Sequence, residues 1–176
     1  MIESIALPGL EGKVVVVIDA GDAQGPAICG SLIASGVTVV ATGAAERLPA
    51  PLVDAGTGLP GELHYRALDA ASPEGWTAVA EWVAANTERV DGIVGNALSV
   101  DHAVIALKGH LADHASVVTI GEAAKPGIRS NSITLPGGRG PRPQDVGSAV
   151  AFLLSDLAMY IDGAMLPIGE RPAALI

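Results

Sequence analysis

The run Val14–Ile18 constrains the fold more than any other feature of this chain. Five β-branched apolar residues follow one another with no polar residue among them. This pattern is typical of a strand that is buried on both faces of a sheet. Such a strand needs helices on both sides, and residues 25–35 are predicted to form the first, with Ile28 and Leu32 on one side and Gly36 at the end.

Strand and helix patterns then alternate to the end of the chain. We predict further strands at residues 37–41, 63–68, 92–95, 116–120, 128–135 and 164–168, and helices at 101–114 and 143–155, with another opened by Ser72-Pro73-Glu74 and a short one near 44–48. The interior must be built from small aliphatic residues, since 49% of the chain is hydrophobic and only 3% aromatic. Residues 1–176 are therefore predicted to form a single α/β domain with a doubly wound parallel sheet.

One connection is too short for this pattern. Only seven residues, 121–127, separate the strand that ends at Ile120 from the strand that begins at Ile128. A parallel crossover that contains a helix needs about a dozen residues or more. Either an extended crossover spans the gap, or the two strands are rearranged or swapped between subunits.

The charge of the chain excludes several partners. A net charge of −9 argues against nucleic acid and against an anionic membrane surface, because both require basic protein surface. No apolar run approaches the roughly 20 residues that span a bilayer, and residues 1–12 lack the pattern of a signal peptide. We therefore expect a cytoplasmic protein. Cys29 is the only cysteine and falls on an apolar helical stretch, where a packed thiol is expected.

Two stretches, residues 9–42 and 141–169, resemble the short-chain dehydrogenase/reductase family. The resemblance implies a Rossmann-like fold, a nicotinamide cofactor and a catalytic Tyr-x-x-x-Lys. This chain departs from the last of these, because its only tyrosines, Tyr65 and Tyr160, are followed four positions on by Asp69 and Ala164. No catalytic residue is therefore predicted.

The cofactor turn of the family also departs from its pattern. Thr-Gly-x-x-x-Gly-x-Gly corresponds here to residues 18–25, where Asp19 and Ala23 replace the first two glycines and only the last, Gly25, is kept. Asp19 would place a carboxylate near a phosphate site. Two like charges about 4 Å apart repel by roughly 4 kcal/mol at an effective dielectric constant of 20. We therefore predict a strand–helix joint that binds no nucleotide.

The other matches to cofactor positions are scattered. Asp69 matches the adenine-side aspartate of the family, Asn96 belongs to its Asn-Ala pair, and Gly43 stands where an acid would hold an NAD ribose. The resemblance thus leaves Gly21, Gly25, Asp69 and Asn96 as vestigial cofactor positions. No cofactor is predicted.

Two segments of the family are missing. The catalytic helix would lie between Ile120 and Ile128, and a substrate lid would follow Leu135, whereas Pro143 begins the next helix within a few residues. The predicted fold is therefore a shortened Rossmann-like sheet without catalytic helix or lid. Loss of the helix should also uncover apolar surface on the sheet.

The histidines give no clear metal site. His110 and His114 would share one helical face, a spacing that zinc can use, but no third ligand is marked by spacing. A solvated polar face is the better interpretation. No metal is predicted.

Three functions remain. The first is a non-catalytic subunit that assembles with itself or with a full-length short-chain reductase through residues 143–168. The second is an isomerase, lyase or cyclase that uses the remnant cleft without nicotinamide, where Asp19, Asp22, Asn96 and Glu122 would converge. The third is a small-molecule binding module.

Overall fold

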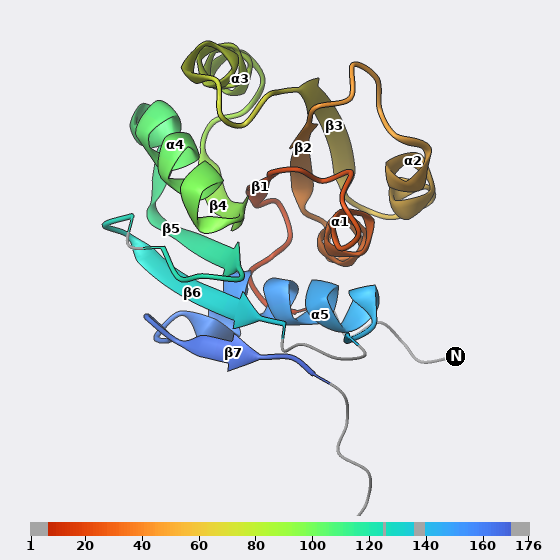
Figure 1. Ribbon diagram of the computed structural model, residues 1–176, viewed down its shortest axis with the longest axis vertical. Helices are drawn as coiled ribbons and strands as arrows, with labels where there is room; N and C mark the ends of the chain where they lie inside the picture. Colours follow the sequence, from red (N-terminus) through yellow and green to blue (C-terminus); the bar gives the residue numbers. More distant parts are fainter. Residues whose placement is uncertain (1–6, 125, 136–139, 170–176) are drawn as a thin grey trace, which may run out of the picture.

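Seven parallel strands form one sheet in the order β3-β2-β1-β4-β5-β6-β7 (Figure 1). A computed structural model describes residues 7–124, 126–135 and 140–169. The strand order reverses between β1 and β4, as in a doubly wound fold. The predicted parallel α/β sheet is confirmed.

The elements follow the predicted alternation closely. The strands are β1 (Val14–Val17), β2 (Thr38–Gly43), β3 (Glu62–Ala67), β4 (Val90–Gly95), β5 (Leu111–Ile120), β6 (Arg129–Thr134) and β7 (Met165–Pro167). The helices are α1 (Gly25–Ala34), α2 (Ala50–Gly56), α3 (Pro73–Asn86), α4 (Ala97–Leu107) and α5 (Pro143–Leu154), with single 3₁₀ turns η1 (Lys108–His110) and η2 (Asp156–Ala158).

The helices cover the two faces of the sheet unequally. Helices α1, α2 and α5 pack on one face, which we call the α1/α5 face, and α3 and α4 pack on the other, the α3/α4 face (Figure 1). The valines of β1 alternate between the two, with Val15 and Val17 in one cluster and Val16 in the other. This two-sided burial explains the uninterrupted apolar run of the first strand.

Helices α1 and α5 approach each other closely. A Cβ atom added to Gly147 of α5 would lie 2.5 Å from the carbonyl oxygen of Ala27 and 2.5 Å from Oγ of Ser31, both on α1. Only glycine fits at this contact. The inward residues of α5 are at most 2% exposed, as predicted: Val146, Val150, Leu153 and Leu154.

Two helix predictions need correction. The short helix lies at Ala50–Gly56 and not near 44–48, because Pro49 disfavours helical backbone at the residue before it and the helix can begin only afterwards. Helix α4 runs over Ala97–Leu107 and not over 101–114, because the side chain of Asn96 caps it early. His114 consequently lies on strand β5, so His110 and His114 do not share a helical face.

The short connection after β5 is an extended crossover within one chain. Strands β5 and β6 pair directly, from Ser116 opposite Arg129 to Ile120 opposite Ile133. Residues 121–124 and 126–128 contain no helix, and residue 125 lies outside the described residues. Ala124 and Ile128 pack in the cluster of the α3/α4 face. We call residues 121–124 and 126–128 the strap, since Ala124 and Ile128 hold this connection against the α3/α4 face.

The sheet beneath the strap is not bare, contrary to our expectation. Val117 is fully buried there, and Ser130, 9% exposed, donates a hydrogen bond from its hydroxyl to the carbonyl of Ala124 over 3.2 Å. Thr119 and Ser132 are also buried. These four residues of β5 and β6 are therefore covered, and three of them are polar. The region of the lid begins at residues 136–139, which lie outside the described residues.

Strongly exposed apolar side chains occur on helix α4, where Leu98 is 67% and Ile105 is 75% exposed, and in the segment that follows α5. Leu157, Met159, Tyr160 and Met165 are between 55% and 93% exposed, and all four lie between the end of α5 and strand β7. No helix in the described part of the chain is long and apolar enough to cross a membrane.

Candidate functional site: the cleft at the carboxyl ends of the strands

The candidate site is a cleft at the carboxyl ends of β1 and β4, where the strand order reverses. Ligands of open α/β sheets bind at this position. The cleft has a volume of about 260 Å³. Its lining includes Asp19, Asp22, Gln24, Gly25, Asn96 and Ile120. We call it the C-edge cleft.

The turn between β1 and α1 forms one wall of this cleft. Asp19 has a φ angle of 52°, in the left-handed region that favours glycine, and is the only described non-glycine residue with positive φ. The amide of Asp22 donates to the carbonyl of Asp19, and the amide of Gly25 donates to the carbonyl of Asp22, each over 3.0 Å. Both amides therefore satisfy the turn itself and do not point at an anion.

The charge of the turn is also unfavourable for a phosphate. Burial raises the pKa of the Asp19 carboxyl above its ordinary value, and the negative charges of Asp22 and Asp69 raise it further. The electrostatic environment at this end of the sheet therefore opposes negative charge. A pyrophosphate would add to that repulsion.

Gly25 is required by the fold itself. A Cβ atom added there would overlap the carbonyl group of Ala20 and would lie 2.7 Å from its Cα. Helix α1 can start against β1 only because residue 25 has no side chain. The retention of this glycine is therefore explained by close helix–strand packing.

Asn96 and Asp69 each cap a piece of backbone. The side-chain oxygen of Asn96 accepts the amide of Ser99 over 2.9 Å at the start of α4. A carboxylate oxygen of Asp69 accepts the amide of Ala71 over 3.0 Å in the turn before α3. Asn96 lines the C-edge cleft, whereas Asp69 does not. Both residues thus have a local structural task.

Gly21 is the one vestigial position without such a task. An added Cβ atom there would meet Cγ of Pro49 at 3.6 Å, an ordinary contact, and its φ angle is not positive. Nearby, the hydroxyl of Tyr65 lies 3.0 Å from the carbonyl of Gly43 and 2.7 Å from that of Ala45. The loop after β2 is therefore fastened beside the turn, on the side where a ribose would bind.

These residues do not fit a nicotinamide dinucleotide. The volume of the C-edge cleft, about 260 Å³, is below the range of roughly 300–1,000 Å³ that is usual for drug-sized ligands. Asp19 and Asp22 stand where the pyrophosphate would approach. Glu122, which we expected to converge with them, is exposed and does not line the cleft.

The other polar candidates do not form a metal site. Among residues 7–124, 126–135 and 140–169, no group of three or more His, Cys, Asp or Glu side chains could hold a metal ion. A ring nitrogen of His102 lies 3.2 Å from the carbonyl of Ala70, which also accepts the indole N–H of Trp76 over 3.0 Å. This histidine thus helps to hold the turn before α3.

Two residues of the cleft were missed from the sequence. Gln24 lines the cleft with an unpaired, buried side-chain oxygen, and Ile120 lines it as well. Gln24 occupies a variable position of the family's Thr-Gly-x-x-x-Gly-x-Gly turn, so that motif could not indicate a role for it. Ile120 is the last residue of β5, and its position beside β4 could have indicated it.

The family model described as short chain dehydrogenase matches residues 13–119. No curated protein matches the chain.

Solved structures share the fold. A short-chain dehydrogenase/reductase from Serratia marcescens has a TM-score of 0.77 at 20% identity, with 90% of this chain and 97% of that chain covered. A hydroxysteroid dehydrogenase from Escherichia coli has a TM-score of 0.77 at 19% identity, with 91% and 96% covered. A short chain dehydrogenase from Mycobacterium smegmatis has a TM-score of 0.74 at 20% identity, with 93% and 94% covered.

Proposed function

The chain belongs to the short-chain dehydrogenase family, and we propose that it serves as a non-catalytic subunit that assembles through residues 143–168. Its partner is a second copy of itself or an active full-length reductase homologue in the cytoplasm. One observation carries the proposal. In the cofactor turn, the retained Gly25 has a role in the fold, whereas Asp19 and Ala23 replace the two glycines that would serve a nucleotide.

The vestigial cofactor positions support this view. Asn96 and Asp69 accept backbone amides, so selection for a stable fold alone would keep them. Gly21 has no structural requirement of its own. The pattern is that of a scaffold which no longer needs to bind a dinucleotide.

The tyrosines support it as well. The hydroxyl of Tyr65 is engaged with the carbonyls of Gly43 and Ala45, and Tyr160 follows η2, away from the C-edge cleft. A proton transfer from tyrosine to a carbonyl needs a neighbouring cation that lowers the phenol pKa. For Tyr65 the opposite holds, since burial raises its pKa and the charge of Asp19 adds to the rise.

The two edges of the sheet differ in a way that favours assembly through β7. Edge strand β3 is protected by polar side chains, with the guanidinium of Arg66 4.2 Å above the ring of Trp82 and His64 beside the same ring. Edge strand β7 is short and exposes Met165 to 62%. An exposed apolar edge of this kind normally needs a partner.

The test is association of the purified chain, alone and co-expressed with full-length reductases encoded nearby. We expect a stable complex by light scattering at micromolar concentration, and we expect Met165→Glu to weaken it at least tenfold. Val53→Glu is the matched control, because Val53 is 47% exposed on α2. Helix α2 connects β2 to β3, which lie at the opposite edge of the sheet from β7. Ile168→Glu is less suitable, since Ile168 packs partly against the core and its loss would also affect folding.

A monomer in all these conditions would contradict the proposal. So would nicotinamide-dependent turnover that persists in preparations free of host reductases. A complex that forms without such turnover by this chain would support it.

A further inference from the structure

The carboxylates at the C-edge cleft have no counter-ion in the described part of the chain. Asp19 and Asp22 line the cleft, and Asp69 lies near enough for its charge to act on Asp19. No lysine, arginine or histidine is among the described lining residues. The ion pairs of the described residues use other carboxylates, namely Glu62, Asp91, Asp145 and Asp156. The negative charge at this cleft is therefore left uncompensated by these residues.

Asp19 keeps its position at a cost to the fold. Its side chain is half-buried, and burial together with the charges of Asp22 and Asp69 raises the pKa of its carboxyl. Its backbone has a φ angle of 52°, which glycine adopts more readily. Groups that are held against the stability of the fold cluster at ligand sites. A positive charge in the cleft would reverse the electrostatic part of this cost.

Gln24 adds an oxygen that lacks a hydrogen-bond donor. It precedes helix α1 as the N-cap residue, yet its side chain makes no capping bond. Its Oε1 atom is buried without a partner among the described residues, and the residue lines the same cleft. A buried acceptor without a donor is unfavourable, and a donor in the cleft would remove that penalty. This second feature points to a ligand independently of the carboxylates.

The rest of the lining restricts the size and polarity of such a ligand. Apolar walls come from three strands and a helix: Val17, Val94, Ile120 and Ile28. The volume of about 260 Å³ corresponds to roughly eight or nine water-sized groups of about 30 Å³ each. The described residues offer no group of three His, Cys, Asp or Glu side chains for a metal ion. A small organic cation with a short carbon chain fits this lining better.

From these observations we infer that the C-edge cleft binds a small primary ammonium compound with a short apolar chain. An ammonium group has three N–H donors and no acceptor. The carboxylates of Asp19 and Asp22 and the amide oxygen of Gln24 supply three acceptor groups. Charge-assisted hydrogen bonds of this kind are roughly twice as strong as neutral ones. The inference goes beyond the proposed function and does not depend on how the chain assembles.

The helix ends at the cleft do not reverse this preference for positive charge. The amino terminus of an α-helix carries about half a positive charge, and both α1 and α4 begin beside the cleft. Two such ends offset about one negative charge, whereas Asp19 and Asp22 carry two when ionised. The amides of Asp22 and Gly25 are moreover bonded within the turn. The cleft therefore remains acidic.

A titration followed by two-dimensional NMR tests the inference with n-butylammonium chloride as the probe. At constant ionic strength, we expect saturable shifts of the amide signals of Ala23, Gln24 and Asn96. Two matched compounds separate charge from shape, because 1-butanol has the same chain without the charge and tetramethylammonium has the charge without an N–H donor. We expect the dissociation constant of each to be at least tenfold higher than that of n-butylammonium.

Variants of the chain locate the site. Asp19→Asn should raise the dissociation constant of n-butylammonium at least tenfold, and Gln24→Met should raise it at least threefold. Asp113→Asn is the matched control and should stay within twofold, because Asp113 is exposed near the start of β5, at the opposite end of the sheet. The same spectra show whether each variant is folded.

Several results would overturn the inference. Equal affinity for 1-butanol would show that the cleft takes only apolar groups. Equal affinity for tetramethylammonium would reduce the effect to a general attraction of cations by a chain of net charge −9. Absence of shifts at the cleft, or binding that Asp19→Asn leaves unchanged, would overturn it as well. Each of these results leaves the proposed assembly standing, since light scattering measures assembly without any ligand.

Discussion

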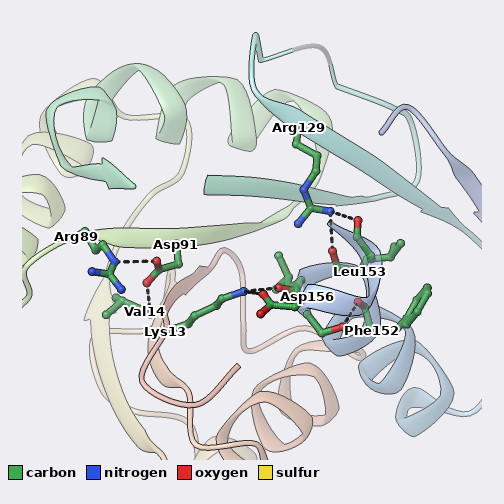
Figure 2. Close-up of polar contacts among 11 residues, drawn as sticks. Lys13, Val14, Arg89, Asp91, Arg129, Phe152, Leu153 and Asp156 are labelled. Atoms are coloured by element: carbon green, nitrogen blue, oxygen red, sulfur yellow. Dashed lines mark hydrogen bonds and ion pairs between the residues drawn. The ribbon is translucent and has the colours of Figure 1, made fainter. Parts of the chain in front are cut away.

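The two ends of the sheet differ in how their charged side chains are arranged: opposite charges pair at the amino ends of the strands, and like charges adjoin at the carboxyl ends. A hollow at the amino ends of the strands, the N-edge groove, is lined by Lys13, Arg89, Asp91 and Arg129 (Figure 2). There Lys13 and Arg89 each contact a carboxylate, and the half-buried Arg129 donates to backbone carbonyls. At the C-edge cleft, Asp19 lies near two other carboxylates and is held at a φ angle of 52°. The ion pairs of the first end stabilise the folded state. The like charges and the positive φ angle of the second end destabilise it. The difference indicates that the charges at the amino ends of the strands support the fold, whereas the carboxylates at the carboxyl ends do not.

The largest effect should come from Gly25, the residue of the cofactor turn that the fold still needs. Gly25→Ala places a methyl group against the Ala20 carbonyl, and we expect a loss of about 3 kcal/mol in the free energy of unfolding. Gly109→Ala is the control, because no atom lies within 4 Å of its added Cβ. Urea denaturation measures both. An unchanged stability of Gly25→Ala would remove the structural explanation for this glycine.

The next largest effect should appear at the N-edge groove. Asp91→Ala leaves the amide of Val14 without its acceptor and Arg89 without its partner. We expect a loss of about 2 kcal/mol, against less than about 0.5 kcal/mol for Asp113→Ala, which is exposed on the same groove. Equal stabilities of the two variants would show that the pairing at this end contributes nothing.

At the C-edge cleft, a substitution should raise the free energy of unfolding instead of lowering it. Asp19→Gly relieves the left-handed backbone and removes a carboxylate from its like-charged neighbours, so we expect a gain of about 1 kcal/mol. Asp22→Ala separates the two causes, because it removes only charge. A loss of stability in Asp19→Gly by urea denaturation would contradict the contrast between the two ends.

The smallest effect concerns pH. Because the pKa of Asp19 in the folded chain is raised above 3.8, the folded state holds its proton more tightly than the unfolded state. Its ionisation therefore lowers stability as pH rises from 3.8 to the raised value. Asp19→Asn should be more stable than the unsubstituted chain at neutral pH, and this advantage should disappear in acid below 3.8. An advantage that is independent of pH would show that charge is not its source.

The general form of the fold could be predicted from local patterns. The valines of β1, the glycine after α1 and the Ser72 cap of α3 each act over a few residues, and each was found as predicted. The predicted start of helix α4 is wrong because Asn96 was considered only through the family's Asn-Ala pair, although Asn is also a favoured helix cap. The preference of Asn for the N-cap position could therefore have indicated where this helix begins.

The sites depend on long-range contacts and could be predicted only in part. The carboxylates of the cofactor turn were visible, but not the backbone of Asp19 or the amides engaged within the turn. The N-edge groove was missed altogether. Its ion pair between Lys13 and Asp156 joins residues 143 positions apart, and no local pattern specifies such a contact.

Calorimetric titration with NAD(H) and NADP(H) tests the central claim most directly, namely that this chain keeps the scaffold of its family and has lost the nucleotide site. A catalytically active full-length homologue serves as the positive control under the same conditions. For this chain we predict no binding with a dissociation constant of about 10 μM or tighter, which corresponds to roughly −7 kcal/mol. Saturable binding of either cofactor at or below that value would contradict the claim.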